Sequence, residues 1–123
     1  MGYNVRVESY FSAAHNLRGY QGKCENVHGH NWKVEVKISS DILDKTGMVI
    51  DFTDVKAMLA KITSKLDHKQ LNKLSYFKKK NPTSENIAEF IYGEFKKNLK
   101  QKRHKLESVS VWETPTSCAT FYL

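Results

Sequence analysis

Two long stretches in which apolar and polar residues alternate constrain the fold of this chain more than any other feature. In the stretch 28–40, apolar side chains alternate with polar ones from Trp32 to Ile38, and residues 4–15 follow a similar pattern. A period of two is typical of a half-buried β-strand, because successive side chains of a strand point to opposite faces. We therefore expect strands at about residues 3–15 and 28–40, in a sheet with one apolar face.

Three histidines lie on the apolar side of these strands. His28 and His30 begin the second strand two positions apart, and His15 ends the first. Side chains two positions apart share a face, about 6 to 7 Å from each other. Antiparallel pairing through the Gly-rich segment 17–22 would bring His15 beside them. Three neutral imidazoles with a fourth position open are typical of a catalytic zinc ion, whereas a hydrogen-bonded core histidine is the alternative for each ring alone.

Cys24 lies in the connection that leads to His28, directly after Lys23. A neighbouring cation or metal makes a thiolate available as a base or nucleophile. As a fourth ligand, Cys24 would instead close the zinc site and make it structural. The residues leave both roles open. Cys118 lies in the last expected strand, where we expect an inert buried thiol.

Between and after these strands, the pattern predicts two helices and two further strands. Apolar residues at helical spacing mark one helix through residues 55–66 and another through 87–99, after a short extended piece near 48–52. Their candidate N-caps are Asp51 or Thr53 and Thr83 or Ser84. Strands near 109–113 and 117–123 close the chain. The expected order is ββααββ, an α+β fold with a four-stranded antiparallel sheet and both helices on one face.

Two further positions carry groups suited to chemistry. Asp67 and His68 are expected to end the first helix, and a carboxylate beside a histidine supports acid–base work. Glu113 ends an apolar strand, where a carboxylate is costly to bury without partners, so it can bind a cationic or amide-rich ring edge. A polar helix end and a strand-end surface residue are the ordinary alternatives.

Length and charge limit the class of protein. The 123 residues suit one domain over 1–123. The chain has no apolar run that could cross a membrane and a strand-like start in place of a signal peptide, and two cysteines make no disulfide framework, so we expect a cytoplasmic protein. The net charge of +7 favours an anionic partner. Without an RNA-binding signature, we expect a polyanionic small molecule rather than nucleic acid.

Over nearly its whole length, the chain resembles the 6-pyruvoyl-tetrahydropterin synthase superfamily. The segments that carry the resemblance occur in the same order: FSAAH (11–15), KCENVHGH (23–30), GMVIDF (47–52), LDHKQLN (66–72), NPTSENIA (81–88) and VSVWET (109–114). Three residues separate Cys24 from His28, a spacing similar to that of the 6-carboxy-5,6,7,8-tetrahydropterin synthases of the queuosine pathway. The pyruvoyl-forming branch typically has a longer insertion there.

The resemblance implies a lyase that converts 7,8-dihydroneopterin triphosphate to 6-carboxytetrahydropterin, acetaldehyde and triphosphate. It also implies the tunnelling fold, in which ββααββ subunits join their sheets into an oligomeric β-barrel, as a trimer or hexamer with active sites at subunit interfaces. Two alternatives stay open. One is the pyruvoyl-forming relative, which eliminates triphosphate without losing carbon. The other is a zinc-stabilised binding module without catalysis, in which Cys24 is a fourth ligand.

The resemblance further implies roles for individual residues. The zinc ligands would be His15, His28 and His30. The catalytic groups would be Cys24, Asp67, His68 and Glu113. The pterin-binding residues would be Glu113, Thr83 and Ser84. In this scheme the Cys24 thiolate removes a proton from the substrate side chain, Asp67 and His68 form a proton relay, and Glu113 anchors the pterin ring.

Overall fold

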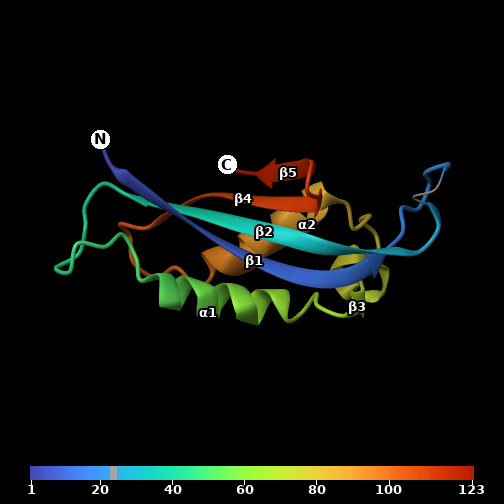
Figure 1. Cartoon of the computed structure of the whole chain (residues 1–123), viewed down its shortest axis with the longest axis horizontal. Helices are drawn as coiled ribbons and strands as arrows, with labels where there is room; N and C mark the ends of the chain where they lie inside the picture. Colours follow the sequence, from blue (N-terminus) through green and yellow to red (C-terminus); the bar gives the residue numbers. More distant parts are fainter. Residues whose placement is uncertain (23–24) are drawn as a thin grey trace.

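A twisted sheet built on one long hairpin forms the frame of the molecule (Figure 1). The computed structural model describes residues 1–22 and 25–123. Strands β1 (Tyr3–His15) and β2 (His28–Ser40) pair antiparallel along their whole length, with His15 opposite His28. The bounds predicted from the alternation are confirmed. This register follows from the pattern itself, because a slip of one residue would turn every apolar side chain to the opposite face.

Three shorter strands complete the sheet in the order β3-β1-β2-β4-β5. Strand β4 (Lys105–Thr114) pairs antiparallel with β2, and β5 (Ser117–Phe121) pairs antiparallel with β4. These are the four antiparallel strands that the sequence predicts. Strand β3 (Lys69–Gln70) was not expected, and it pairs parallel with Ala13 and Ala14 at the free edge of β1. The sheet is therefore mixed, with β3 beside the end of β1 that carries His15.

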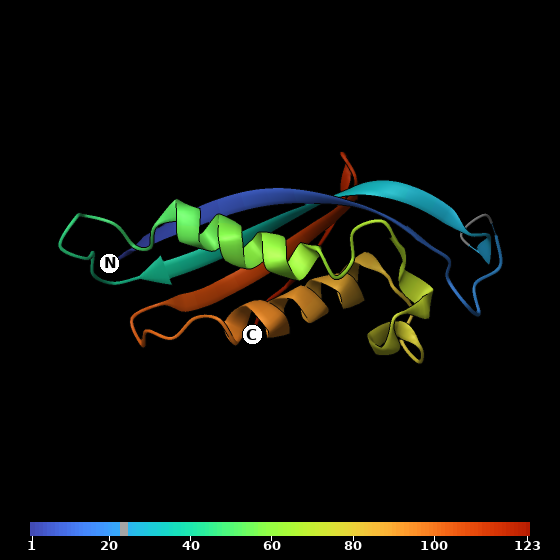
Figure 2. The same ribbon diagram turned by 90° about the horizontal axis from the view of Figure 1, so that it is seen from below.

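Two helices cover one face of the sheet, and Figure 2 shows them side by side across the strands. Helix α1 (Phe52–Thr63) begins at Asp51, whose side chain accepts a hydrogen bond from the Thr53 backbone N–H. Helix α2 (Ser84–Lys96) begins at Thr83, whose side chain accepts one from the Asn86 N–H. Each cap satisfies one of the amide groups that a first helical turn leaves unpaired. Two short 3₁₀ helices, η2 (Leu71–Lys73) and η3 (Ser75–Phe77), join β3 to α2.

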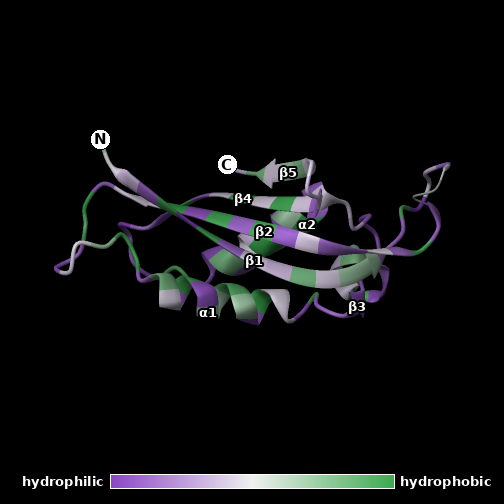
Figure 3. Ribbon diagram, viewed as in Figure 1, coloured by the Kyte–Doolittle hydropathy of each residue, from purple (hydrophilic) through white to green (hydrophobic). Residues whose placement is uncertain are grey.

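The core lies between the helices and the apolar face of the sheet. Figure 3 shows the alternation of hydrophobic and hydrophilic residues along β2. Trp32, Val34 and Val36 on this strand are fully buried and pack with residues of both helices. The opposite face of the sheet carries charged side chains, such as Lys33 paired with Glu8. None of the helices among the described residues is long and apolar enough to span a membrane.

Two expectations differ from the structure. The short extended piece expected near 48–52 forms no strand among these described residues: Asp44 binds Met48 through its side chain and its backbone N–H, Asp51 is extended, and helix α1 begins at Phe52. Cys118 is exposed rather than buried. Cys118 lies in the edge strand β5 and pairs with Trp112 of β4, and paired residues share a face of the sheet. The neighbouring pair, Val111 with Ala119, faces the helices instead, so Cys118 faces away from the core.

Candidate metal centre

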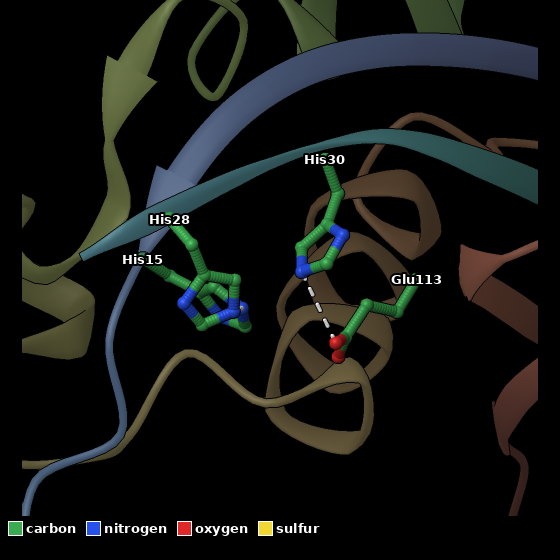
Figure 4. A group of neighbouring side chains, drawn as sticks. All are labelled: His15, His28, His30 and Glu113. Atoms are coloured by element: carbon green, nitrogen blue, oxygen red, sulfur yellow. Dashed lines mark hydrogen bonds and ion pairs between the residues drawn. The ribbon is translucent and has the colours of Figure 1, made fainter. Parts of the chain in front are cut away.

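Three imidazoles converge at the end of the β1–β2 hairpin (Figure 4). His15 and His28 form a directly opposed cross-strand pair, and His30 lies opposite Ala13, two positions further along. The ring centroids are 4.6 Å apart for His15 and His28, 4.8 Å for His28 and His30, and 5.3 Å for His15 and His30. The fully buried Trp32 packs edge-on against His15 and His30 and closes the apolar side of the cluster.

Backbone carbonyls orient two of the rings. The Nδ1 atom of His15 lies 2.7 Å from the Pro82 carbonyl oxygen, and that of His28 lies 2.7 Å from the Asn26 oxygen. A carbonyl oxygen only accepts, so each Nδ1 carries the hydrogen, and in the neutral ring each Nε2 then presents a lone pair. The two Nε2 atoms face each other at 3.0 Å. Two lone pairs at this distance repel unless a cation lies between them, so the arrangement fits a bound metal ion.

Glu113 of β4 completes the cluster. One of its carboxylate oxygens lies 3.1 Å from His30 Nε2 (Figure 4). This Nε2 atom is buried and makes no hydrogen bond of suitable direction with any described residue. One donor atom from each of His15, His28, His30 and Glu113 lies within 4.8 Å of the others. The structure therefore brings together the three predicted ligands and adds a carboxylate that can also reach an ion.

Burial favours the metal-binding form of two candidate ligands, His15 and His30. Removal from water lowers the pKa of His15 below its ordinary value, and the Pro82 carbonyl and the Glu113 carboxylate oppose this effect without reversing it. Burial likewise lowers the pKa of His30, again against the attraction of Glu113. A lowered pKa favours the neutral imidazole at neutral pH. Neutral imidazole is the state that donates a lone pair to a metal ion.

Asp67 and His68 form the expected pair, but outside the metal cluster. Helix α1 ends at Thr63, and the two residues lie in the turn that follows. One Asp67 oxygen lies 3.0 Å from His68 Nδ1, and the other accepts a hydrogen bond from the Ser12 backbone N–H at 2.9 Å. His68 has a φ of 58° and a side chain that is 83% exposed. Among the described residues, neither belongs to the four-residue metal cluster.

The other predicted site residues are Cys24, Thr83 and Ser84, and the last two do not belong to the metal cluster of the described residues. Cys24 lies outside the described residues. Thr83 caps α2 and Ser84 is its first residue, which places both next to Pro82, the partner of His15. Their contact with a pterin stays a prediction. Sequence reasoning missed the carbonyl oxygens of Pro82 and Asn26, because main-chain groups carry no signature of their own. Only the position of Pro82 within the segment NPTSENIA pointed to this part of the chain.

Comparison with known proteins places these features in a family. Residues 4–123 match the family model described as 6-pyruvoyl tetrahydropterin synthase. A 6-carboxy-5,6,7,8-tetrahydropterin synthase of Haemophilus influenzae is 34% identical, over 94% of this chain and 95% of its own length. A 6-pyruvoyl tetrahydrobiopterin synthase of Drosophila melanogaster is 37% identical, over 90% of this chain and 74% of its own.

Comparison of the fold with solved structures points to the same family. The solved structure of the Caenorhabditis elegans 6-pyruvoyl tetrahydropterin synthase superposes with a TM-score of 0.90 at 28% identity, covering 100% of this chain and 96% of that one. This similarity confirms the expected tunnelling-fold subunit. Together, the match over residues 4–123 and the shared fold show that the chain belongs to the 6-pyruvoyl tetrahydropterin synthase family.

Proposed function

We propose that this chain is a zinc-dependent 6-carboxy-5,6,7,8-tetrahydropterin synthase of queuosine or 7-deazapurine biosynthesis, working in the cytoplasm. It converts 7,8-dihydroneopterin triphosphate and one water molecule to 6-carboxytetrahydropterin, with release of acetaldehyde and triphosphate. The observation that carries the proposal is the pair of Nε2 lone pairs of His15 and His28, 3.0 Å apart beside His30. The named relative from Haemophilus influenzae supports the carboxy-forming reaction.

His15, His28 and His30 hold the zinc ion in this proposal. Zinc ligands lie about 2.0–2.1 Å from the ion, so small rotations of these rings suffice to close the site. When bound, zinc acts as a Lewis acid that lowers the pKa of the substrate's side-chain hydroxyls and stabilises developing oxyanions. The carbonyl oxygens of Pro82 and Asn26 hold two of the rings in the productive tautomer.

The proton transfers belong to Cys24, Asp67 and His68. The Cys24 thiolate removes a proton from the substrate side chain. His68 returns a proton or activates the cysteine, and the Asp67 carboxylate, 3.0 Å from His68 Nδ1, supports the protonated imidazole. We propose that this pair acts on the metal centre of a neighbouring subunit in a trimer or hexamer. The exposure of His68, and its position outside the cluster of its own chain, support this arrangement.

Glu113 anchors the pterin ring. A carboxylate accepts two parallel hydrogen bonds, which suits the ring N–H and the exocyclic amine of a pterin. Its oxygen lies 3.1 Å from His30 Nε2, so a ring held by Glu113 would present its side chain to the zinc site. The backbone at Thr83 and Ser84 contributes further contacts to the ring.

Product analysis tests the reaction. The protein is loaded with zinc and incubated with 7,8-dihydroneopterin triphosphate, and the products are identified by mass spectrometry. We expect 6-carboxytetrahydropterin and acetaldehyde in equal amounts. A pyruvoyl product without acetaldehyde would instead support the pyruvoyl-forming alternative, which the relative from Drosophila melanogaster favours.

A single substitution tests the non-catalytic alternative. Cys24→Ala is expected to keep zinc and the fold while losing turnover, because the thiolate acts as a base. If Cys24 is a fourth ligand in a binding module, the same variant releases zinc or unfolds. Metal content and far-ultraviolet circular dichroism distinguish the two outcomes.

A further inference from the structure

Two asparagine side chains hold the backbone that follows His15. The Asn72 carboxamide accepts a hydrogen bond from Asn16 N at 2.9 Å and donates one to Asn16 O at 2.9 Å. The Asn81 carboxamide does the same to Arg18, accepting from its N and donating to its O, each at 2.9 Å. Each side chain thus satisfies both main-chain groups of one residue, as a neighbouring β-strand would.

These contacts continue the pairing that β3 begins. Strand β3 ends at Gln70, opposite Ala14, and the next contact along the chain is that of Asn72 with Asn16. Beyond it, Asn81 binds Arg18. The edge of β1 is therefore paired by the main chain of β3, and the residues after β1 are paired by the side chains of Asn72 and Asn81. Among the described residues, these hydrogen bonds join the chain just after β1, which ends at His15, to the segment that runs from η2 to α2.

Asn72 and Asn81 act at opposite ends of the contact that orients His15, in which His15 Nδ1 lies 2.7 Å from the Pro82 carbonyl oxygen. Asn72 binds Asn16, the residue that directly follows His15, and Asn81 directly precedes Pro82. The Asn81 carbonyl is held in turn by the Asn86 side chain at 2.8 Å. Neither asparagine belongs to the metal cluster of the described residues. Through these hydrogen bonds the two asparagines fix the backbone next to His15 and next to its carbonyl partner.

We propose that Asn72 and Asn81 are positioning residues of the metal centre. They hold both ends of the His15–Pro82 contact, so that the His15 lone pair points at the ion before the ion arrives. This inference rests on the proposed role of His15 as a zinc ligand. Groups that orient metal ligands typically contribute about 10- to 100-fold in metal affinity, and loss of either carboxamide should weaken binding by an amount in that range.

The test compares Asn72→Ala and Asn81→Ala with the control Asn98→Ala. Asn98 also bonds a main-chain oxygen through its side chain, that of Glu94 at 2.9 Å, but at the far end of α2. Zinc affinity is measured by competition with a chromophoric chelator, and the visible spectrum of the cobalt-loaded protein reports the ligand geometry. We expect the first two variants to bind zinc about 10- to 100-fold more weakly with a shifted cobalt spectrum, and Asn98→Ala to match the wild type.

Wild-type affinity and an unchanged cobalt spectrum in both variants would overturn the inference. If an alanine variant does not fold, the aspartate at the same position, Asn72→Asp or Asn81→Asp, replaces it and is judged in the same way. Aspartate keeps the acceptor for the backbone N–H but has no donor for the carbonyl oxygen. Wild-type affinity and spectrum in Asn72→Asp would overturn the role of Asn72. A wild-type protein that binds neither metal overturns the proposed function and the inference with it, and this outcome is visible before any variant is compared.

Discussion

At the scale of single residues, Glu113 has two possible partners in one small space. Its carboxylate lies 3.1 Å from His30 Nε2 and also within reach of an ion held by the histidines. Glu113 needs its negative charge both as a pterin anchor and as a metal ligand. Removal of the charge weakens substrate binding in the first case and metal binding in the second. The substitution Glu113→Gln separates them, because glutamine has nearly the same size.

We expect Glu113→Gln to keep the metal and to bind substrate more weakly. The glutamine side chain has one acceptor oxygen, and its NH2 group would face the N–H donors of the pterin edge, with which it cannot form a hydrogen bond. Loss of a hydrogen bond to a charged group costs about 1.5–3 kcal/mol, which raises KM or Kd by about 10- to 150-fold. Metal content and substrate binding are measured on the same samples. A Gln variant that loses the metal would show instead that Glu113 is a ligand.

Asp67 gives a prediction about pH. The Ser12 N–H, and after it the contact with His68, lower the pKa of Asp67 below its ordinary value of 3.8. The folded state therefore favours the carboxylate, and this contributes stability at pH values above the ordinary pKa. The contribution is lost as the pH falls through the lower pKa of the folded protein, because both states are then protonated.

We therefore expect Asp67→Asn to be less stable than the wild type at neutral pH. The difference should shrink as the pH falls below about 4 and vanish where Asp67 is protonated in the folded protein. Thermal unfolding of both proteins across this range is the measurement. An equal difference at all pH values would mean that the charge of Asp67 is not what stabilises this turn.

At the scale of elements, the start of α2 serves both folding and the site. Thr83 caps the helix by accepting the Asn86 N–H at 3.1 Å, and the preceding Pro82 carbonyl orients His15. We expect Thr83→Ala to lower the free energy of unfolding by about 1 kcal/mol, since it removes the cap. Thr83→Ser retains a hydroxyl and should stay close to the wild type. Urea unfolding measures both, and equal midpoints for Thr83→Ala and the wild type would contradict the role of the cap.

The elements differ in how well the sequence predicts them. Strands β1 and β2 follow directly from alternation, because burial of one face demands a period of two. Strand β3 has only two residues, too few to carry any period, and it forms because the turn at Asp67 and His68 brings it to the edge of β1. The piece near 48–52, expected to be extended, forms no strand: the Asp44 side chain binds Met48 at its start, and α1 begins at its last residue, Phe52.

At the scale of the whole molecule, the candidate metal centre joins the β1–β2 hairpin to a strand near the other end of the sequence, β4. His15 comes from β1, His28 and His30 from β2, and Glu113 from β4. An ion held there binds the folded state alone, because the unfolded chain does not bring these groups together. Binding of this kind stabilises the fold by mass action, by about 2.7 kcal/mol at a free ligand concentration of 100 times Kd.

We expect zinc to raise the Tm and a chelator to lower it again. His28→Ala should abolish the shift, because it removes one of the two facing lone pairs. His104→Ala is the matched control, since His104 bonds the Val49 carbonyl outside the cluster. Differential scanning calorimetry with and without zinc measures the shift. An equal zinc-dependent shift in His28→Ala and the wild type would exclude His28 as a ligand.

The sequence by itself determined the sheet hairpin, the common face of His15, His28 and His30, and the family resemblance, because alternation and motif spacing are local properties of the chain. Only the tertiary structure decided which way the imidazole lone pairs point. That depends on the carbonyls of Pro82 and Asn26, and Pro82 lies far from His15 in sequence. It also decided that Glu113 meets His30 and that Asp67 and His68 lie at the edge of β1, because strand pairing and helix packing set distances that no local pattern contains.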